Sequence, residues 1–429
     1  MTEPVTPGGQ GGIAPHKIVT MAGNALTILK DSLEVLQTSG LPADVQLRKV
    51  FRENRKFGSR DRHFITSALF AYYRWCGWLE KVFPPETDMR LLLLGAFAAQ
   101  GDLPVTWQLW CEELKLDPEK VAAVFQLPRA EDRLAALAGS DVICCNEDML
   151  AAWMCEKLAS GGRERYLPAL RSRPPVWIRI QKNTDQVLRE LDQNRVEWKK
   201  DDRLPSAYCL NSHANVNLCL LECYKRGCFE IQDFASQCIG YSSMAQTGEQ
   251  WWDACAGGGG KTLLLATLLK EGGQVFASDI REKKLEEIKI RAQRASYNNI
   301  RYLKWNDAHK MQFDGVLTDV PCSSSGRWRR NPEMRLVCTE KWLEQLTQTQ
   351  YEILDKAAGS VKPGGLLVYG TCSVFDQENN GVTDRFLDAH PEFEPAPFTI
   401  GGTTQWRLQV FPEDANCDGT FCARFRRKA

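Results

Sequence analysis

Apolar and polar positions along this chain follow two different patterns. Between residues 16 and about 140, apolar side chains recur at the spacing of an amphipathic helix, and no strand pattern interrupts them. Positions that show this spacing include Ala25, Ile28, Leu29, Leu33 and Leu36. Residues 146–172 continue in the same style, and Pro174-Pro175 then ends it. The first third of the chain is therefore predicted to be a small helical bundle.

Beyond residue 175, short apolar runs alternate with charged segments of helical spacing. A strand over 176–180, a helix over 184–193 and strands near 196–198 and 227–233 predict a small α+β unit. Five further strands are expected at 250–254, 275–278, 301–305, 313–319 and 364–370. Helices are expected at 261–270, 282–297, 339–358 and 377–389, and two late strands near 406–411 and 420–425. Strands that alternate with helices predict a mostly parallel, doubly wound sheet.

These patterns divide the chain into four parts. We expect a flexible tail over residues 1–15, a helical domain over 16–145, a small α+β unit over 146–235 and an α/β domain over 236–429. The tail is rich in Gly, Pro and Thr and lacks the apolar stretch that signal peptides contain. The predicted fold class is α/β.

Composition bears on the cellular setting. Lys+Arg and Asp+Glu both number 54 among 429 residues, so contacts with nucleic acid must come from local patches. Sixteen cysteines without Cys-x-x-Cys spacing are typical of a reducing compartment, and we expect a cytoplasmic protein. The apolar run at 91–99 is too short to cross a bilayer, so no membrane association is expected.

A glycine-rich stretch joins the first two strands of the predicted large sheet. After Asp253 and Ala254 come Cys255, Ala256, Gly257, Gly258, Gly259, Gly260, Lys261 and Thr262. Glycines allow a backbone to approach a ligand closely, because no Cβ intervenes. Asp279 ends the second strand, 26 positions after Asp253, where such sheets bind a ribose. The stretch therefore predicts a dinucleotide-like or S-adenosylmethionine site.

Two other interpretations of this stretch stay open. Gly260-Lys261-Thr262 resembles the end of a P-loop, with Asp319 in the place of a metal-holding acid. The first glycine of a P-loop would fall at position 255, which is Cys255, and this disfavours the interpretation. The remaining interpretation is a connection that binds no ligand. Asp279, at the end of the second strand, disfavours that one.

Five chemically reactive or charged side chains follow the ends of predicted strands. They are Asp279, Asp307, Asp319, Cys322 and Cys372. In doubly wound sheets, ligands bind beyond the carboxyl ends of the strands. If the strands at 313–319 and 364–370 are neighbours, Cys322 and Cys372 face one cleft beside Asp319. One cysteine at a strand end is usually structural, whereas two beside an acid indicate a functional site.

Three motifs carry a resemblance to a known family. Residues 253–262, Asp319-Val-Pro-Cys322 and Thr371-Cys-Ser373 together resemble the RsmB/Sun family of S-adenosylmethionine-dependent RNA cytosine-5 methyltransferases. Residues 227–237, 330–333 and 418–421 are similar to further segments of that family. The region around Arg60-Asp61-Arg62 looks like the NusB-like helical domain of its bacterial ribosomal RNA members. The resemblance covers nearly the whole chain and implies a Rossmann-like class I methyltransferase domain.

The resemblance also assigns roles to individual residues. It implies that Cys372 is the nucleophile, that Cys322 assists product release and that Asp319 contacts the base. The implied S-adenosylmethionine ligands are Cys255, Ala256, Gly257, Gly258, Gly259, Gly260, Lys261, Asp279, Asp307 and Asp319; no metal is implied. The chain departs from the family pattern at Gly257 and Gly258, which replace Ala-Pro and predict a more flexible loop, and at Lys284 and Ser324.

Elementary chemistry explains why such residues are needed. Carbon 5 of cytosine is a poor nucleophile, and attack of a thiolate at carbon 6 makes carbon 5 enamine-like. A thiol with a pKa of about 8.5 is mostly protonated at pH 7, so Cys372 must be activated. Asp319, protonated near the base, is expected to hydrogen-bond the N3 edge and stabilise charge pushed into the ring. Lys261 is expected to support the geometry and charge of the site rather than to act as a base.

Two clusters of basic residues are candidates for contact with RNA. The first surrounds Gly58-Ser59 and consists of Arg52, Arg55, Lys56, Arg60 and Arg62; the second is Arg327-Trp328-Arg329-Arg330. Cations would meet phosphates and Trp328 would stack on a base, whereas the alternative for each cluster is a solvated loop. We expect a monomeric enzyme that methylates 16S ribosomal RNA. The alternatives are transfer RNA as substrate, or an RNA-binding assembly factor with a degenerate cofactor loop.

Overall fold

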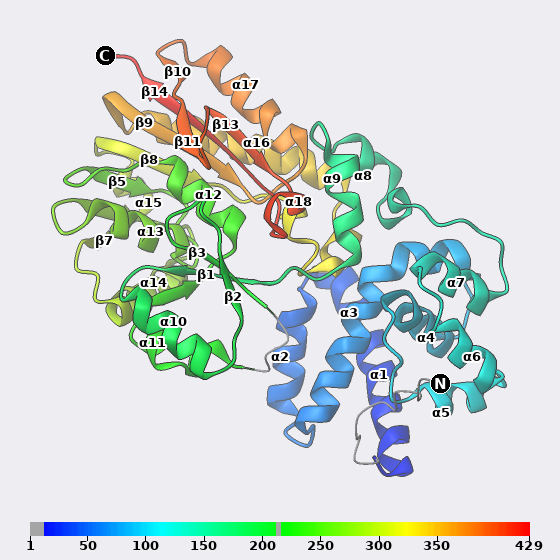
Figure 1. The fold of residues 1–429 in the computed structure, drawn as a ribbon. Coiled ribbons are helices and arrows are strands. Elements are labelled where there is room, and N and C mark those ends of the chain that lie inside the picture. Colours follow the sequence, from blue (N-terminus) through cyan, green and yellow to red (C-terminus); the bar gives the residue numbers. More distant parts are fainter. Residues whose placement is uncertain (1–12, 212–215) are drawn as a thin grey trace. The chain divides into compact units, whose positions relative to one another are not determined.

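The computed structural model describes residues 13–211 and 216–429 (Figure 1). These residues group into two compact units. Unit 1 comprises the described residues up to Ala152 together with 331–337, and unit 2 comprises 153–330 and 338–429. The predicted flexible tail falls mainly on residues 1–12, outside the described part of the chain.

Unit 1 is helical, as predicted. Its elements are α1 (Pro15–Ser39), α2 (Ala43–Glu53), α3 (Ser59–Val82), α4 (Met89–Gln100), α5 (Trp107–Leu114), α6 (Pro118–Val124), α7 (Ala130–Ala138) and the 3-10 turn η1 (Asn146–Met149). Buried positions of α1 recur three or four residues apart and pack against α3. The rings of Phe64 and Phe97 stack with centroids 6.1 Å apart beside the buried Trp110. The NusB-like character of this unit stays a prediction.

A segment from the second half of the chain belongs to unit 1. The 3-10 turn η5 (Pro332–Leu336) packs on α3. Glu333 Oε1 accepts a hydrogen bond from the N–H of Ala43 at 3.0 Å, in the first turn of α2. Arg335 Nη2 donates to the carbonyl oxygens of Tyr73 and Arg74. These residues were predicted to belong to the α/β domain, whereas their contacts group them with the helices of unit 1.

Unit 2 begins with short helical turns and a small sheet. The turns are α8 (Ala152–Glu156), which starts at the last residue of unit 1, α9 (Gly162–Arg165) and η2 (Leu167–Arg171). The antiparallel sheet has the order β2 (Trp198–Lys200), β3 (Ala207–Leu210), β1 (Val176–Ile180) and β4 (Phe229–Ile231). α10 (Thr184–Gln193), η3 (Leu218–Leu220) and α11 (Glu222–Lys225) accompany it. β3, which pairs with both β1 and β2, was not predicted from the sequence.

The large sheet of unit 2 has the order β10-β14-β9-β8-β5-β6-β7, with β13 beside β14. Its parallel strands are β5 (Gln250–Asp253), β6 (Gln274–Ala277), β7 (Ile300–Tyr302), β8 (Phe313–Asp319) and β9 (Val361–Thr371). The antiparallel strands are β10 (Phe393–Pro395), β13 (Arg407–Val410) and β14 (Thr420–Arg427). The predicted Rossmann-like α/β domain is confirmed. β7 is shorter than predicted, because Trp305 already begins α15 (Trp305–Ala308).

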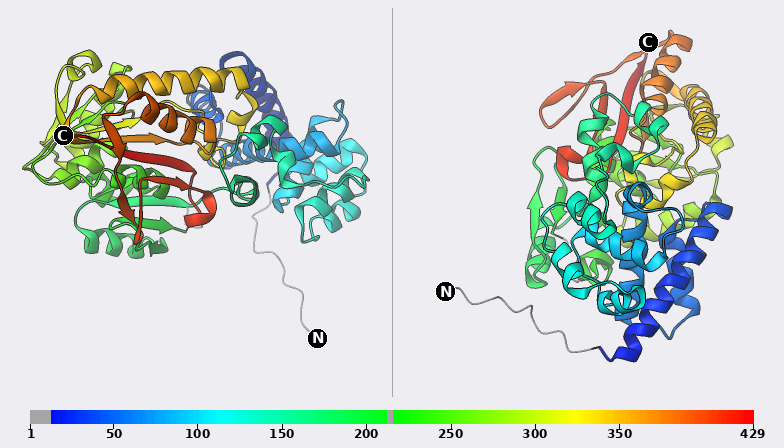
Figure 2. Two further views of the ribbon diagram at one scale, coloured as in Figure 1. Left: turned by 90° about the horizontal axis from the view of Figure 1, so that it is seen from above. Right: turned by 90° about the vertical axis from the view of Figure 1, so that its right-hand side faces the viewer.

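Helices cover both faces of the large sheet. Successive strand residues point to opposite faces, so Trp251 and Trp252 enter different cores. The Trp251 core includes side chains of α12 (Phe234–Ser242), α13 (Gly260–Leu269) and α14 (Glu282–Ala295). The Trp252 core includes those of α15, α16 (Glu340–Ala358) and α17 (Asn380–Ala389). Figure 2 shows α16 and α17, in yellow and orange, along one side of the sheet.

The remaining elements of unit 2 are short. They are a hairpin of β11 (Phe398–Ile400) and β12 (Thr403–Gln405), α18 (Pro412–Ala415), and the 3-10 turns η4 (Ser325–Arg327) and η6 (Asp376–Glu378). The sequence analysis did not predict β10, β11 or β12. None of the helices in the described residues is long and apolar enough to cross a membrane.

Candidate active site

The order in which the chain adds strands to the large sheet reverses between β5 and β8. From β5 the chain winds through β6 and β7 on one side, and β8 and β9 lie on the other. Ligands of doubly wound sheets bind beyond the carboxyl strand ends at such a point. Asp253 ends β5 and Asp319 ends β8. Cys322 and Cys372 follow β8 and β9, which pair in parallel, so the predicted neighbourhood of these strands is confirmed.

The glycine-rich loop is tied to the neighbouring strand ends. The N–H of Ala256 donates to the carbonyl of Ser278 at 2.9 Å, and the N–H of Gly257 donates to Asp279 Oδ2 at 2.8 Å. Gly257 and Gly259 have φ of +51° and +82°, a conformation that favours glycine. A Cβ on Gly259 would lie 2.8 Å from the Ile288 side chain of α14. The loop is therefore a defined turn, although its sequence predicts flexibility.

Lys261 and Thr262 each bind an acid of the strand ends. Lys261 Nζ lies 2.6 Å from Asp319 Oδ2, and the hydroxyl of Thr262 donates to Asp253 Oδ2 at 2.6 Å. In a P-loop, the lysine reaches phosphates and the hydroxyl binds a metal ion. Thr262 and Asp253 are both fully buried here, so the hydroxyl is enclosed by protein. The P-loop interpretation is therefore wrong for this stretch.

The acids of this region differ in their electrostatic environment. Burial raises the pKa of Asp253 to about 7, and its Oδ1 accepts no hydrogen bond from the described residues. Burial also acts to raise the pKa of Asp279, but hydrogen bonds from Arg281 and Gly257 outweigh it and lower that pKa. Asp279 thus keeps its negative charge at the end of β6. For Lys261, the charge of Asp319 outweighs burial and raises the pKa of the amine.

The two predicted active-site cysteines are neighbours. Their Sγ atoms lie 3.2 Å apart. The N–H of Cys372 donates to Cys322 Sγ at 3.3 Å, and Ser324 Oγ lies 3.4 Å from Cys372 Sγ. Both side chains are half-buried, so they remain open to a substrate.

The thiols of this pair differ in acidity. A hydrogen bond from Cys322 lowers the pKa of Cys372 in spite of burial, and the positive charge of Arg327 and the hydroxyl of Ser324 act in the same direction. The same thiol–thiol hydrogen bond, together with burial, raises the pKa of Cys322. These opposite shifts of pKa favour a thiolate at Cys372, with Cys322 as the thiol that donates to it.

Glu378, in η6, is a site residue that the sequence analysis missed. Its carboxylate is fully buried and accepts hydrogen bonds from Ser323 and Ser373, the residues that directly follow the two cysteines. From the sequence, Glu378 was predicted to lie at the start of a helix over 377–389, with no role in the site. Only the pairing of β8 with β9 brings its partners together.

Other predicted cofactor residues lie in different settings. Ala256 is buried, and Cys255, Gly258 and Gly260 are half-buried in the loop between β5 and α13. Burial raises the pKa of Cys255 well above its usual value, so this thiol stays protonated. Asp307 is exposed on α15, five residues beyond the end of β7, and its role stays a prediction.

The basic segment after Cys322 is largely built into the protein. Trp328 is fully buried and its ring lies 5.6 Å from that of Phe375, so the predicted stacking of Trp328 on a base is wrong. Arg329 is buried and donates to the carbonyl of Cys417 and to Ser172. Arg330 forms ion pairs with Asp233 and Asp418. Arg327 is the exposed cation of the segment.

The basic cluster of unit 1 also has a structural member. Arg62 Nε donates to the carbonyl of Phe57 at 2.9 Å, and its guanidinium lies 5.5 Å from the ring centre of Phe51. Arg62 therefore braces the turn between α2 and α3. The other cluster members, Arg52, Arg55, Lys56 and Arg60, are exposed. Contact of these four with RNA stays a prediction.

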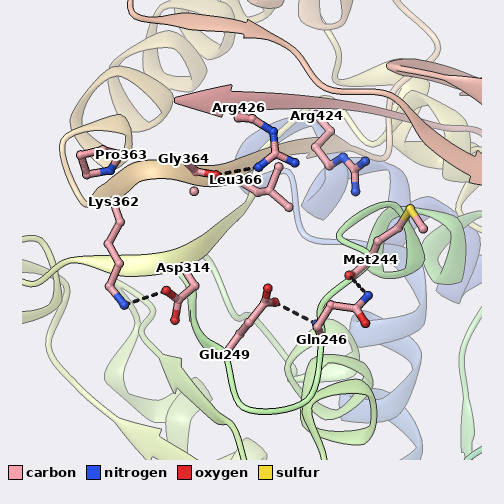
Figure 3. A pocket seen from close by; sticks show the side chains of 11 residues that line it. Met244, Gln246, Glu249, Asp314, Lys362, Pro363, Gly364, Leu366, Arg424 and Arg426 are labelled. Carbon is pink, nitrogen blue, oxygen red and sulfur yellow. Dashed lines mark hydrogen bonds and ion pairs between the residues drawn. The ribbon is translucent and has the colours of Figure 1, made fainter. Parts of the chain in front are cut away.

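A cavity of about 490 Å³ lies at the opposite end of the large sheet (Figure 3). Its lining includes Glu249 before β5, Asp314 at the start of β8 and Arg426 near the end of β14. Lys362 pairs with Asp314 at 2.7 Å across part of it. None of the predicted site residues lines this cavity, so the candidate active site is the cluster at the carboxyl strand ends.

Comparison with protein families places the large sheet among methyltransferases. Residues 243–426 match the sequence model of the family described as 16S rRNA methyltransferase RsmB/F. This match covers both cysteines, the glycine-rich loop and Asp279.

Relatives extend the match beyond that domain. The chain is 30% identical to ribosomal RNA small subunit methyltransferase B of Proteus mirabilis over 275 residues, which are 62% of each protein. It is 30% identical to the protein of the same name from Cronobacter sakazakii over 324 residues, which are 71% of each. The match thus spans slightly less than two thirds of the Proteus mirabilis protein and slightly more than two thirds of the Cronobacter sakazakii protein.

Solved structures show the same fold at lower identity. The crystal structure of PH0851 superposes with a TM-score of 0.71 at 24% identity, over 97% of this chain and 99% of that one. The structure of NSun6 from Pyrococcus horikoshii with SFG superposes with a TM-score of 0.55 at 16% identity, over 66% of this chain and 97% of that one. These superpositions support the Rossmann-like fold of the large sheet.

Proposed function

Since the chain belongs to the RsmB/F family of 16S ribosomal RNA methyltransferases, we propose that it transfers a methyl group from S-adenosylmethionine to carbon 5 of a cytosine in RNA. The proposed substrate is 16S ribosomal RNA, the RNA that the family description names. The observation that carries the proposal is the thiol pair Cys322 and Cys372, 3.2 Å apart beyond β8 and β9. Chemistry at an unreactive ring carbon needs one sulfur that adds and a second group that helps it leave.

The strand ends fit S-adenosylmethionine. The turn at Gly257 and Gly259 keeps Cβ atoms away from the end of β5. Asp279 keeps its charge at the end of β6, where it can accept hydrogen bonds from ribose hydroxyls. Ile280, next to it, is 92% exposed and offers an apolar surface to a base. The superposed NSun6 structure holds SFG, an analogue of this cofactor, which also supports the assignment.

Cys372 is the proposed nucleophile. Its lowered pKa increases the thiolate fraction at neutral pH, and the thiolate adds to carbon 6 of the cytosine. The new S–C6 bond moves the electron pair of the C5–C6 double bond toward carbon 5 and N3. S-adenosylmethionine, when bound, supplies a methyl group on a positively charged sulfur. Carbon 5 takes that methyl group.

Asp319 and Lys261 are proposed to stabilise charge on the ring. Lys261 Nζ lies 2.6 Å from Asp319 Oδ2, so the two side chains can act together on the base. Asp319 is proposed to contact the base. Lys261 is the proposed source of a proton that can pass through Asp319 to N3 of the ring. A charge-assisted hydrogen bond of this kind is stronger than a neutral one.

Cys322 is proposed to assist the release of the product. After methylation, a water molecule takes the proton of carbon 5, and the electron pair of that C–H bond re-forms the C5–C6 double bond. The C6–S bond breaks in the same elimination, and its electron pair returns to the Cys372 sulfur. The thiol of Cys322, 3.2 Å away, donates a hydrogen bond to this departing thiolate. Without that donor, elimination should be slow while addition and methylation proceed.

RNA is the proposed partner, and the target cytosine must leave its stack to reach the two sulfurs. Exposed Arg327, close to the thiol pair, is the cation best placed to meet a phosphate. All sixteen cysteines are free, which suits a reducing cytoplasm. We further propose that the protein acts as a monomer.

Bisulfite sequencing of RNA from cells with and without the gene tests the proposed substrate. One cytosine of 16S ribosomal RNA should lose its protection from bisulfite when the gene is absent. If a cytosine of transfer RNA loses its protection instead, the substrate is transfer RNA and not 16S ribosomal RNA. Calorimetry on the purified protein separates an enzyme from an assembly factor, because a factor with a degenerate loop would release no heat with S-adenosylmethionine.

A further inference from the structure

One buried carboxylate joins the loops that carry the two cysteines. Glu378 Oε1 accepts from the N–H of Ser323 and from Gln350 Nε2, both at 2.8 Å. Its Oε2 accepts from the hydroxyls of Ser323 and Ser373. Ser323 follows Cys322 and Ser373 follows Cys372, so a single side chain holds both loops in register.

Neighbouring hydroxyl and amide groups reinforce this junction. Ser325 Oγ lies 3.0 Å from Ser373 Oγ and accepts from the N–H of Val374 at 3.0 Å. The side chain of Asn379, next to Glu378, bonds Thr371 Oγ1 at 2.7 Å and the carbonyl of Ser373 at 3.1 Å. The thiols therefore lie on two loops, and buried hydrogen bonds between these loops fix the distance between them.

Glu378 also brings a negative charge to the site. It is fully buried, and within the described residues no cation lies within ion-pair distance of it. Burial raises the pKa of Glu378 above its usual value, and four hydrogen bonds from Ser323, Ser373 and Gln350 limit that rise without cancelling it. A buried carboxylate that is held by donors alone leaves its charge to act on nearby titratable groups.

We propose that Glu378 is a positioning residue that sets the distance between the two thiols and makes Cys372 the more reactive of the two. Only the catalytic use of this difference between Cys372 and Cys322 rests on the proposed function. The carboxylate and the neighbouring loops would hold the thiols in this way whether or not RNA is the substrate.

The charged groups around the two cysteines act differently on the pKa of Cys322 and on the pKa of Cys372. The charge of Glu378 raises the pKa of Cys322. For Cys372, the charged groups that act most strongly are Arg327, which lowers the pKa, and Asp319, which raises it. Lys261 also interacts with Cys372, and its ammonium stabilises a thiolate. Glu378 thus opposes ionisation of Cys322, while Arg327 and Lys261 favour ionisation of Cys372.

Alkylation of the full-length protein by iodoacetamide, followed by mass spectrometry of each cysteine, tests this proposal without RNA or cofactor. In the wild type, Cys372 should react faster than Cys322 at pH 7.5. E378Q removes the charge, while the hydroxyls of Ser323 and Ser373 can rotate to accept from the new amide. The ratio of the two rates should fall about threefold or more, since half a pKa unit changes a thiolate fraction about threefold.

Two further variants separate charge from structure. E378D keeps the carboxylate and should keep a ratio closer to that of the wild type than E378Q does. D376N, on the same turn, removes an exposed carboxylate that accepts from Asn380 and should leave the ratio unchanged. The proposal is overturned if E378Q lowers the melting temperature but leaves the ratio at the wild-type value, because Glu378 would then be a structural residue only.

Methyl transfer by the same variants links the asymmetry to catalysis. E378Q should lower kcat with little change in KM for RNA. If the alkylation ratio shifts as expected but the wild type transfers no methyl group to RNA, the proposed function fails and the role of Glu378 stands.

Discussion

The substitution D253N tests the electrostatics at the end of β5. The carboxyl group of Asp253 has a pKa of about 7 in the folded protein, against about 3.9 in an unfolded chain. Between these pH values the native state holds a proton that the unfolded chain has released, so stability falls as pH rises. A difference of about three pKa units at 1.36 kcal/mol each gives a loss of about 4 kcal/mol, complete above about pH 7 and absent below about pH 4.

Asn can accept from the hydroxyl of Thr262 as Asp253 does, but it carries no charge. Urea unfolding of the wild type and D253N, followed by tryptophan fluorescence between pH 3.5 and 7.5, should show nearly equal stability at the acidic end. The variant should become progressively more stable than the wild type toward neutral pH. D202N, which removes a carboxylate whose side chain is 89% exposed, is the control and should show no such divergence. Parallel curves for the wild type and D253N at every pH would mean that the nearby Lys261 fully compensates a buried charge, and would refute the reasoning.

Three further predictions concern the loop and the thiols. D279A should weaken S-adenosylmethionine binding in calorimetry by about 1.5–3 kcal/mol, the value of a charge-assisted hydrogen bond; unchanged affinity would exclude Asp279 as a ligand. G259A should destabilise the protein by about 2–4 kcal/mol in urea unfolding, because a positive φ and contact with Ile288 add up, whereas G248A, with a positive φ in open space, should cost less. Equal losses in these two variants would show that the contact contributes nothing. The alkylation rate of Cys372 should rise with pH to a midpoint below about 8.5, and a midpoint at or above that value would contradict its lowered pKa.

The parts of the site that follow from strand periodicity could be predicted from the sequence. Short apolar runs that end in Asp253, Asp279 and Asp319 identify the carboxyl ends of three parallel strands. In the structure, Asp253 and Asp319 are the last residues of β5 and β8, and Asp279 lies two residues beyond β6. The pairing of the strands before Cys322 and Cys372 was a conditional prediction, since strand order is a long-range property. The pairing of β8 with β9 confirms it.

Burial of polar and aromatic groups could not be predicted in the same way. The segment from Arg327 to Arg330 has the composition of an exposed RNA-binding loop, yet Trp328 packs against Phe375, a residue 47 positions later. Its neighbour Arg330 is neutralised by Asp233 and Asp418, which belong to distant parts of the chain. The sequence alone does not reveal such partners, because the fold brings them together from distant parts of the chain.

Glu378 was missed for a related reason. A glutamate in a polar run usually faces solvent, because burying its charge requires several donors. Those donors come from Ser323, Gln350 and Ser373, and two of them lie on loops that meet only when the sheet has formed. Short strands such as β3 were also missed, since four residues give too little periodicity to separate a strand from a loop.

The central claim is that Cys372 adds to the base and Cys322 helps it leave. The most direct measurement is denaturing gel electrophoresis of C322A and C372A after incubation with S-adenosylmethionine and 16S ribosomal RNA. C322A should still form the S–C6 bond and methylate carbon 5, so a covalent protein–RNA adduct should accumulate. C372A and the double variant should form no adduct. An adduct in C372A that is absent from C322A would reverse the two roles, and no adduct in either single variant would contradict the two-thiol mechanism.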